Sequence, residues 1–178
     1  MTMKTTTSTK LCLGLLSANL LFFSCGNPST EKHNHEEHAA TESTTVASPS
    51  AESTSNDLLI EGDDQMKFNQ SEFKVKVGEP INLTLRHSGK LAKEVMGHNL
   101  VVLKSGTDVD AFAKAALQAK DDEYIPTSLS DAIISHTALV GGGEASTISF
   151  TLAEAGTYDF ICSFPGHAAL MKGIIIAE

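Results

Sequence analysis

Short alternations of apolar and polar residues run along the chain from residue 57 onward. In segments 73–77 and 81–86, Phe, Val, Ile and Leu alternate with Lys, Asn, Thr and Arg. Because successive side chains of a strand point to opposite faces, this pattern predicts half-buried strands. The intervening Gly-Glu-Pro at 78–80 predicts a hairpin turn or a corner, because proline cannot donate to a sheet ladder. Further strands are expected at 99–104, 147–152, 157–162 and 173–177.

Six or more short strands imply an all-β fold, either a sandwich or a barrel. One segment departs from this pattern. Between Val109 and Leu117, apolar residues recur at the spacing of one helix face, and Asp108 stands at the N-cap position. The sequence therefore predicts one small α-helix inserted between strands. The folded part, residues 57–178, is long enough to enclose a single hydrophobic core.

The first 24 residues have the pattern of a secretory signal. Lys4 and Lys10 precede an apolar run over 11–23, which is shorter than the roughly 20 residues that cross a hydrocarbon core. Ser24 and Cys25 close the run and resemble a bacterial lipobox. This resemblance implies cleavage before Cys25 and acylation of Cys25, so that lipid holds the mature protein on a membrane. Secretion as a soluble protein, with cleavage nearby, is the alternative.

Residues 25–56 predict a disordered tether between the lipidated cysteine and the folded domain. Ser, Thr, Ala, Glu, Asn and His dominate this segment, which has no aromatic residue and no periodic apolar face. As a flexible coil it spans roughly 30 Å from end to end. It contains His33, His35 and His38, whose grouping offers weak capture of copper or zinc, although a solvated linker is the simpler interpretation.

Charge and cysteine usage narrow the possible functions. The chain has 13 Lys and Arg against 22 Asp and Glu, a net charge of −9, whereas a nucleic-acid binder needs a basic surface. Of its three cysteines, Cys12 is expected to leave with the signal and Cys25 to be acylated, so Cys162 alone remains as a thiol. In an oxidising compartment, a single thiol must be bound to another group or be protected from oxidation.

This thiol and three other side chains of the kinds that bind copper stand at a specific spacing in the sequence. A Cys-x4-His-x3-Met segment supplies Cys162, His167 and Met171, and His98 lies far upstream in a Met-Gly-His-Asn sequence. Thiolate, two imidazoles and a weak thioether are the ligands of a blue-copper electron-transfer site. The distant His98 ties the loop to an earlier strand, so folding would fix the ligand geometry before metal binds. A buried structural cysteine or a thiol hydrolase would not require all four residues.

These two motifs resemble the azurins of the cupredoxin family, and the resemblance covers essentially all of residues 57–178. Further matching segments are 62–69, 85–87 and 134–137. The resemblance implies a Greek-key β-sandwich with a small helix outside it, and one type 1 copper ion. It further implies that His98, Cys162 and His167 bind copper in one plane. Met171 and the carbonyl of Gly97 would lie on the two axial sides.

The resemblance also implies roles for residues around the ligands. Asn99 would brace the two ligand loops, and backbone amides near Asn99 and Phe164 would point at the sulfur of Cys162. His87 is either an ordinary strand histidine or, by the resemblance, a buried group near the site, whereas His136 is expected at the surface. This chain lacks the cysteines for the extra disulfide usual in azurins, and Leu100 stands where azurins often have Trp.

Together, the ligand set and the resemblance predict an electron carrier and not an enzyme. We expect it to cycle copper between Cu(I) and Cu(II) on the periplasmic side of a bacterial membrane or at the cell surface. Expected partners are redox proteins such as c-type cytochromes, or a reductase or oxidase, docking near His167. Copper storage, delivery or protection against copper stress is the alternative function. By analogy, the docking surface around an exposed His167 edge comprises Leu91, Val95, Met96, Phe164, Pro165, Ala169 and Leu170.

Overall fold

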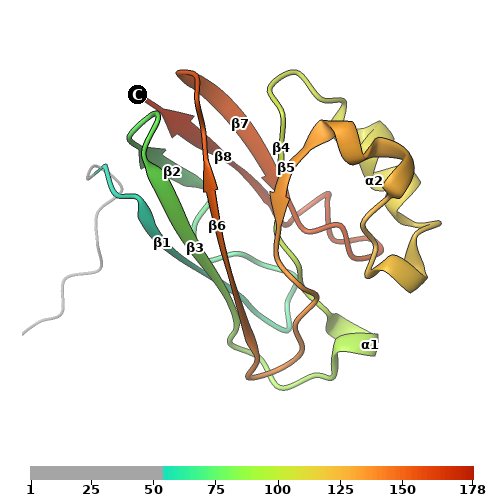
Figure 1. The fold of residues 1–178 in the computed structure, drawn as a ribbon. Helices are drawn as coiled ribbons and strands as arrows, with labels where there is room; N and C mark the ends of the chain where they lie inside the picture. Colours follow the sequence, from blue (N-terminus) through green and yellow to red (C-terminus); the bar gives the residue numbers. More distant parts are fainter. Residues whose placement is uncertain (1–53) are drawn as a thin grey trace, which may run out of the picture. The chain divides into compact units, whose positions relative to one another are not determined.

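The computed structural model describes residues 54–178, where eight strands form two sheets (Figure 1). The predicted signal, Cys25 and the tether up to residue 53 lie outside the described residues. Strands β1, β3 and β6 form one sheet in that order, with β1 parallel to β3 and β3 antiparallel to β6. These strands are Asp57–Gly62 (β1), Pro80–His87 (β3) and Ala145–Thr151 (β6).

The second sheet has the order β2-β8-β7-β4-β5. Strand β2 runs parallel to β8, and the other neighbours are antiparallel. The predicted all-β sandwich is therefore confirmed. The five strands are Glu72–Val75 (β2), Val101–Leu103 (β4), Ile133–His136 (β5), Gly156–Ile161 (β7) and Lys172–Ala177 (β8).

The predicted turn at 78–80 is a corner between the sheets. Strand β2 pairs with β8 in one sheet, whereas β3 belongs to the other, so β2 and β3 do not form a hairpin. Gly78 makes the change of direction with a φ of 77°, a left-handed conformation that suits glycine. Its N–H donates to the carbonyl of Leu152 at 2.8 Å, which fixes the corner to the end of β6.

The predicted helix is present as α2 (Val109–Ala116). Asp108 caps it, because its carboxylate accepts the N–H of Ala111 at 2.9 Å. Three shorter helices were not predicted, since three to six residues are too few to show a periodic face. They are α1 (Lys93–Met96) and the 3₁₀ helices η1 (Lys120–Asp122) and η2 (Thr127–Ala132). Among the described residues, no helix is both long enough and apolar enough to cross a membrane.

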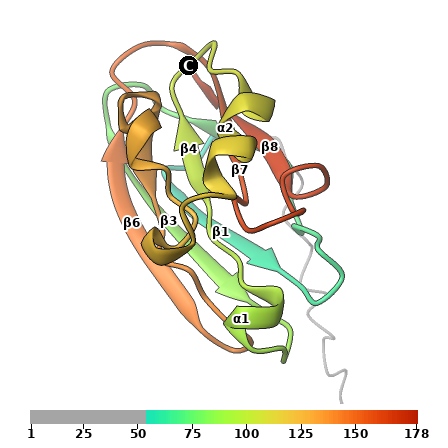
Figure 2. The same ribbon diagram turned by 90° about the vertical axis from the view of Figure 1, so that its right-hand side faces the viewer.

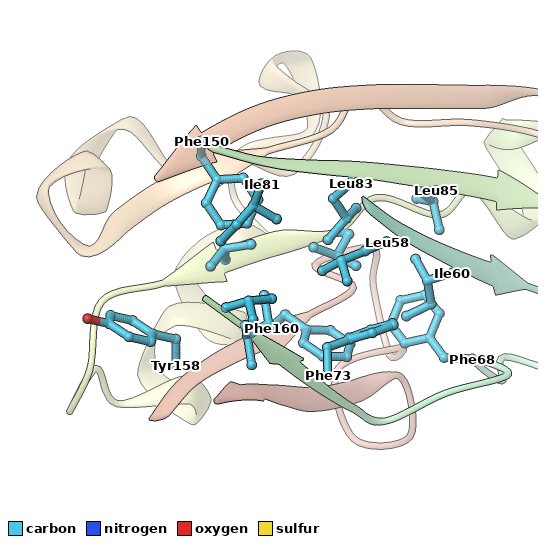
Figure 3. Close-up of a cluster of buried hydrophobic side chains, with 14 of the residues drawn as sticks. Leu58, Ile60, Phe68, Phe73, Ile81, Leu83, Leu85, Phe150, Tyr158 and Phe160 are labelled. Atoms are coloured by element: carbon cyan, nitrogen blue, oxygen red, sulfur yellow. The ribbon is translucent and has the colours of Figure 1, made fainter. Parts of the chain in front are cut away.

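The main core lies between the sheets (Figure 3). Ile81, Leu83 and Leu85 point inward from β3, as their alternation predicts, and all three are fully buried. From the other sheet, the ring of Phe160 lies 5.9 Å from that of Phe68 and 5.8 Å from that of Phe73, measured between centroids. This apolar layer holds the sheets together and continues to Cys162 and Met171 in the segment between β7 and β8.

A second, smaller core explains why β4 shows no alternation in its sequence. Val102 belongs to the main core, while Val101 and Leu103 pack with Phe112 of α2 in a separate cluster. Helix α2 lies over the sheet beside β4 and β7 (Figure 2). Strand β4 is therefore buried on both faces. Strand β7 alternates in the same way: Phe160 points inward, Ile161 outward, and the next residue, Cys162, inward again. This alternation places the thiol inside the sandwich.

Candidate metal centre

The four predicted ligands come from two segments that meet at one end of the sandwich. His98 lies between α1 and β4, and Cys162 follows β7 directly. His167 lies in the loop between β7 and β8, and Met171 is the last residue of that loop. All four side chains are buried. The fold thus brings residues more than 60 positions apart into one enclosed site.

The donor atoms of His98, Cys162 and His167 all lie within 4.8 Å of one another. Nδ1 of His167 is 3.3 Å from Nδ1 of His98 and 3.5 Å from Sγ of Cys162. A metal bound to nitrogen and sulfur at about 2.0–2.3 Å would hold three trigonal donors roughly 3.5–4 Å apart. The observed spacing is close to that of three ligands around one ion, and the soft thiolate and imidazole donors suit copper.

A backbone carbonyl fixes the imidazole of His98 in the orientation that a ligand needs. Nε2–H of His98 donates to the carbonyl of Asp63 at 2.9 Å. In the neutral ring this leaves the lone pair on Nδ1, the atom that faces His167. Burial lowers the pKa of His98 and so favours this neutral form.

The other two titratable ligands are also held in neutral forms in the metal-free protein. Burial raises the pKa of the Cys162 thiol to about 12, although backbone N–H groups of Asn99 and Phe164 oppose this by hydrogen bonding to the sulfur. Burial, together with the neighbouring imidazoles of His98 and His87, lowers the pKa of His167 to about 4. At neutral pH the site therefore holds one thiol and two uncharged imidazoles.

We expect binding of Cu(II) near pH 7.5 to release about one proton, because only Cys162 must be deprotonated. The affinity should then rise about tenfold per pH unit around neutral pH. Below pH 4, His167 of the metal-free protein becomes protonated and the number of released protons should increase. Titration calorimetry in buffers of different ionisation enthalpy measures this number. Release of no proton at neutral pH would contradict coordination by Cys162.

Close packing around two glycines involves the remaining predicted ligands, Met171 and the carbonyl of Gly97. A Cβ added at Gly62 would lie 2.7 Å from the His98 ring and 3.1 Å from Cε of Met171, so His98 and Met171 both pack over Gly62. A Cβ added at Gly97 would lie 2.4 Å from the carbonyl oxygen of Lys93. The backbone at Gly97 therefore excludes any side chain. Axial contacts of Met171 and of the Gly97 carbonyl with copper stay predictions.

Asn99 joins the two segments that carry the ligands, as the sequence analysis predicts. Its Oδ1 accepts the N–H of Ser163 at 2.8 Å, and its Nδ2 donates to the Ser163 hydroxyl at 2.8 Å. Nδ2 also donates to the carbonyl of Glu123 at 3.1 Å. Ser163 is next to Cys162, and Asn99 is next to His98, so this buried amide fixes the spacing between the two ligands.

Several supporting residues were not identified from the sequence. Asp63, Glu123 and Tyr124 each contribute a backbone carbonyl that accepts a hydrogen bond from His98, Asn99 or Ser163. A carbonyl is common to every residue, so sequence carries no signal for such roles. Two other supporting residues could have been identified from the sequence. Ser163 stands directly after the predicted ligand Cys162, and Gly62 is a glycine at the end of a strand.

The two other histidines of the described region lie in different environments. His87 is fully buried and its ring stacks on that of His98, with 4.3 Å between centroids. Its Nε2–H donates to the carbonyl of Met96 at 2.8 Å, and Nδ1 accepts the N–H of Gly89 at 3.0 Å. His87 is thus the buried neighbour of the site, and not an ordinary strand histidine. His136 is exposed, as predicted.

The predicted docking surface needs a correction. His167 is only 2% exposed and Phe164 only 8%, so neither forms the exposed edge that the sequence analysis expects. Both residues are covered because the ring of Phe164 packs against His167, with 4.7 Å between centroids, and against Tyr124. Leu91, Val95 and Leu170 are exposed by 41%, 64% and 65%, as expected.

Known proteins resemble this chain in both sequence and structure. It is 40% identical over 124 residues to azurin from Alcaligenes faecalis, a match covering 67% of this chain and 95% of that protein. It is also 41% identical over 118 residues to outer membrane protein H.8 from Neisseria gonorrhoeae, covering 64% of this chain and 63% of that protein. The match therefore spans less than two thirds of H.8.

A solved structure agrees with these sequence matches. The crystal structure of dithionite-reduced auracyanin from Roseiflexus castenholzii superposes with a TM-score of 0.64 at 30% identity, covering 71% of this chain and 99% of that one. The sequence profile described as copper binding proteins, plastocyanin/azurin family, matches residues 55–178. This match and the arrangement of His98, Cys162, His167 and Met171 confirm copper as the predicted cofactor. The chain belongs to the plastocyanin/azurin family of copper-binding proteins.

Proposed function

We propose that this protein is a membrane-tethered electron carrier. One copper ion would alternate between Cu(I) and Cu(II) and pass single electrons between redox proteins, without catalysing a reaction of its own. The observation that carries this proposal is the convergence of three buried donor atoms, from His98, Cys162 and His167, within 4.8 Å of one another. Ligands that are already in place need little rearrangement when the charge on the metal changes, and this favours fast electron transfer.

Storage or delivery of copper is supported less well by the same geometry. A delivery site must release its ion to an acceptor, which favours exposed or mobile ligands. Here the ligands are buried, and hydrogen bonds between Asn99 and Ser163 hold the two ligand segments together. The three histidines of the tether, His33, His35 and His38, lie outside the described residues and add no support for delivery.

Exposed apolar side chains near the ligands support transient docking of redox partners. Val95 lies three residues before His98, and Leu170 lies three residues after His167. Leu91, Val95 and Leu170 are the exposed large apolar residues that are nearest to the ligands in sequence. Redox proteins associate weakly through small interfaces, which allows rapid release. We infer that c-type cytochromes, or a reductase or oxidase, exchange electrons with the copper near His167.

The membrane tether rests on the amino-terminal sequence. A lipid on Cys25, followed by residues 26–56, would hold the copper domain on the periplasmic side of a bacterial membrane or at the cell surface. The relative from Neisseria gonorrhoeae is named as an outer membrane protein, which favours attachment to a membrane. A chain with these features would exchange electrons without diffusing away from its partners.

One comparison of the wild-type protein with a Cys25→Ser variant tests both parts of this proposal. We expect the wild type in the membrane fraction and the variant in the soluble fraction of the expressing cells. Both copper-loaded proteins should show the same reversible one-electron wave in voltammetry, because Cys25 is remote from the ligands in sequence. Loss of copper on reduction would contradict the electron carrier and favour delivery. Wild-type protein in the soluble fraction would contradict the tether.

A further inference from the structure

The turn after η1 has a glutamate at a position that favours glycine. Tyr124 N–H donates to the carbonyl of Ala119 at 2.7 Å, and Glu123 N–H donates to that of Lys120 at 3.2 Å. This pair of bonds ends helices with a residue in the left-handed conformation, most often glycine. Glu123 adopts it with φ of 53° and ψ of 33°. A side chain is disfavoured there, so the backbone alone does not explain a glutamate.

The carboxylate of Glu123 holds the segment that pairs with His98. Its Oε2 accepts the N–H of Leu139 at 2.9 Å. The next residue, Val140, exchanges two backbone hydrogen bonds with His98, at 2.8 and 2.9 Å. Leu139 also contacts Gly97, because a Cβ added at Gly97 would lie 3.0 Å from the Leu139 side chain. The carboxylate therefore fixes residues 139 and 140, the segment that pairs with the backbone of His98.

The backbone of the same turn holds the segment that carries Cys162. The carbonyl of Glu123 accepts a hydrogen bond from the amide of Asn99, and the carbonyl of Tyr124 accepts one from the hydroxyl of Ser163 at 2.8 Å. Asn99 and Ser163 are both buried and are bonded to each other. The Tyr124 ring packs edge-on against Phe164, with 5.1 Å between centroids. One turn thus binds both ligand segments.

We propose that Glu123 is a positioning residue of the copper site, which sets the spacing between the backbones of His98 and Cys162 through its carboxylate and its carbonyl. The inference rests on the copper site of the proposed electron carrier, but it concerns the metal-free fold as well. It accounts for the presence of a glutamate in a conformation that glycine adopts more readily.

The test compares Glu123→Gly with Glu123→Gln. Glycine suits the left-handed turn and removes the carboxylate, so this variant should fold. Glutamine retains an oxygen that can accept the Leu139 N–H but carries no charge. In the metal-free protein, amide exchange at Leu139 should become at least about tenfold faster in the glycine variant, with Leu83 of β3 unchanged. The glutamine variant should exchange as the wild type does.

Two properties of the copper-loaded protein separate a role at the copper site from a role in the stability of the fold alone. The EPR spectrum of Cu(II) and the reduction potential should shift in Glu123→Gly and stay near wild type in Glu123→Gln. Wild-type exchange at Leu139 together with an unshifted EPR spectrum in the glycine variant would overturn the proposal. A glutamine variant that behaves like the glycine variant would also overturn it, because charge would then be responsible. Amide exchange at Leu139 is measured without copper. It therefore tests the role of Glu123 even if the copper-loaded wild-type protein does not undergo reversible reduction and oxidation.

Discussion

Replacement of Cys162 by serine is expected to abolish the intense visible absorption of the copper-loaded protein. Cys162 supplies the only thiolate of the described residues, and the absorption implied by the family resemblance depends on a copper–thiolate bond. A serine hydroxyl does not deprotonate at neutral pH and is a poor ligand for copper. Removal of a group that merely supports a ligand already costs about 10- to 100-fold in affinity, so loss of the ligand should cost more than a hundredfold.

The serine variant should remain folded, which makes its spectrum interpretable. The backbone N–H groups of Asn99 and Phe164 that bond to the sulfur can donate to the hydroxyl instead. Burial of a hydroxyl in place of a thiol should lower the free energy of unfolding by about 1–3 kcal/mol. A His136→Gln variant, which changes an exposed histidine, should keep both colour and affinity. An intense band in Cys162→Ser would contradict the assignment of this residue as a ligand.

Alternation predicted strands in which the buried face is apolar and the exposed face is polar. Strand β3 is the clearest example, because Ile81, Leu83 and Leu85 are buried, whereas Asn82, Thr84 and Arg86 lie on the opposite face. Strands β1 and β5 were not predicted as strands. In β1, the exposed Leu59 interrupts the alternation between Leu58 and Ile60. Strand β5 has only four residues, and its first three are all partly buried, so the sequence contains no period of two.

Side-chain ligands could be predicted from sequence, whereas the supports around them mostly could not. A copper site requires Cys, His and Met, and few residues of these kinds stand at the required spacing. The supports act through backbone carbonyls, as at Asp63, or through side chains brought close only by folding, as for Glu123 and Leu139. The covering of His167 by Phe164 was missed for the same reason, since it depends on the conformation of the loop.

Replacement of Phe160 by alanine is expected to cause the largest loss of stability among core substitutions. Phe160 is fully buried in β7, near the middle of the five-stranded sheet, and packs against the rings of Phe68 and Phe73. Its ring also covers Gly173 on the neighbouring strand, where an added Cβ would lie 2.4 Å from Cζ of Phe160. Truncation would empty this space and lower the free energy of unfolding by about 3–5 kcal/mol.

This loss should be large because the aromatic cluster fills the space between the two sheets. Cys162 is the single cysteine of the described residues, so no disulfide within them limits the unfolded chain. Urea unfolding of the copper-free protein measures the effect without a contribution from metal binding. Leu59→Ala, a truncation at an exposed site of β1, should change stability by less than about 0.5 kcal/mol. A loss below about 1 kcal/mol for Phe160→Ala would mean that the sandwich does not depend on this aromatic cluster.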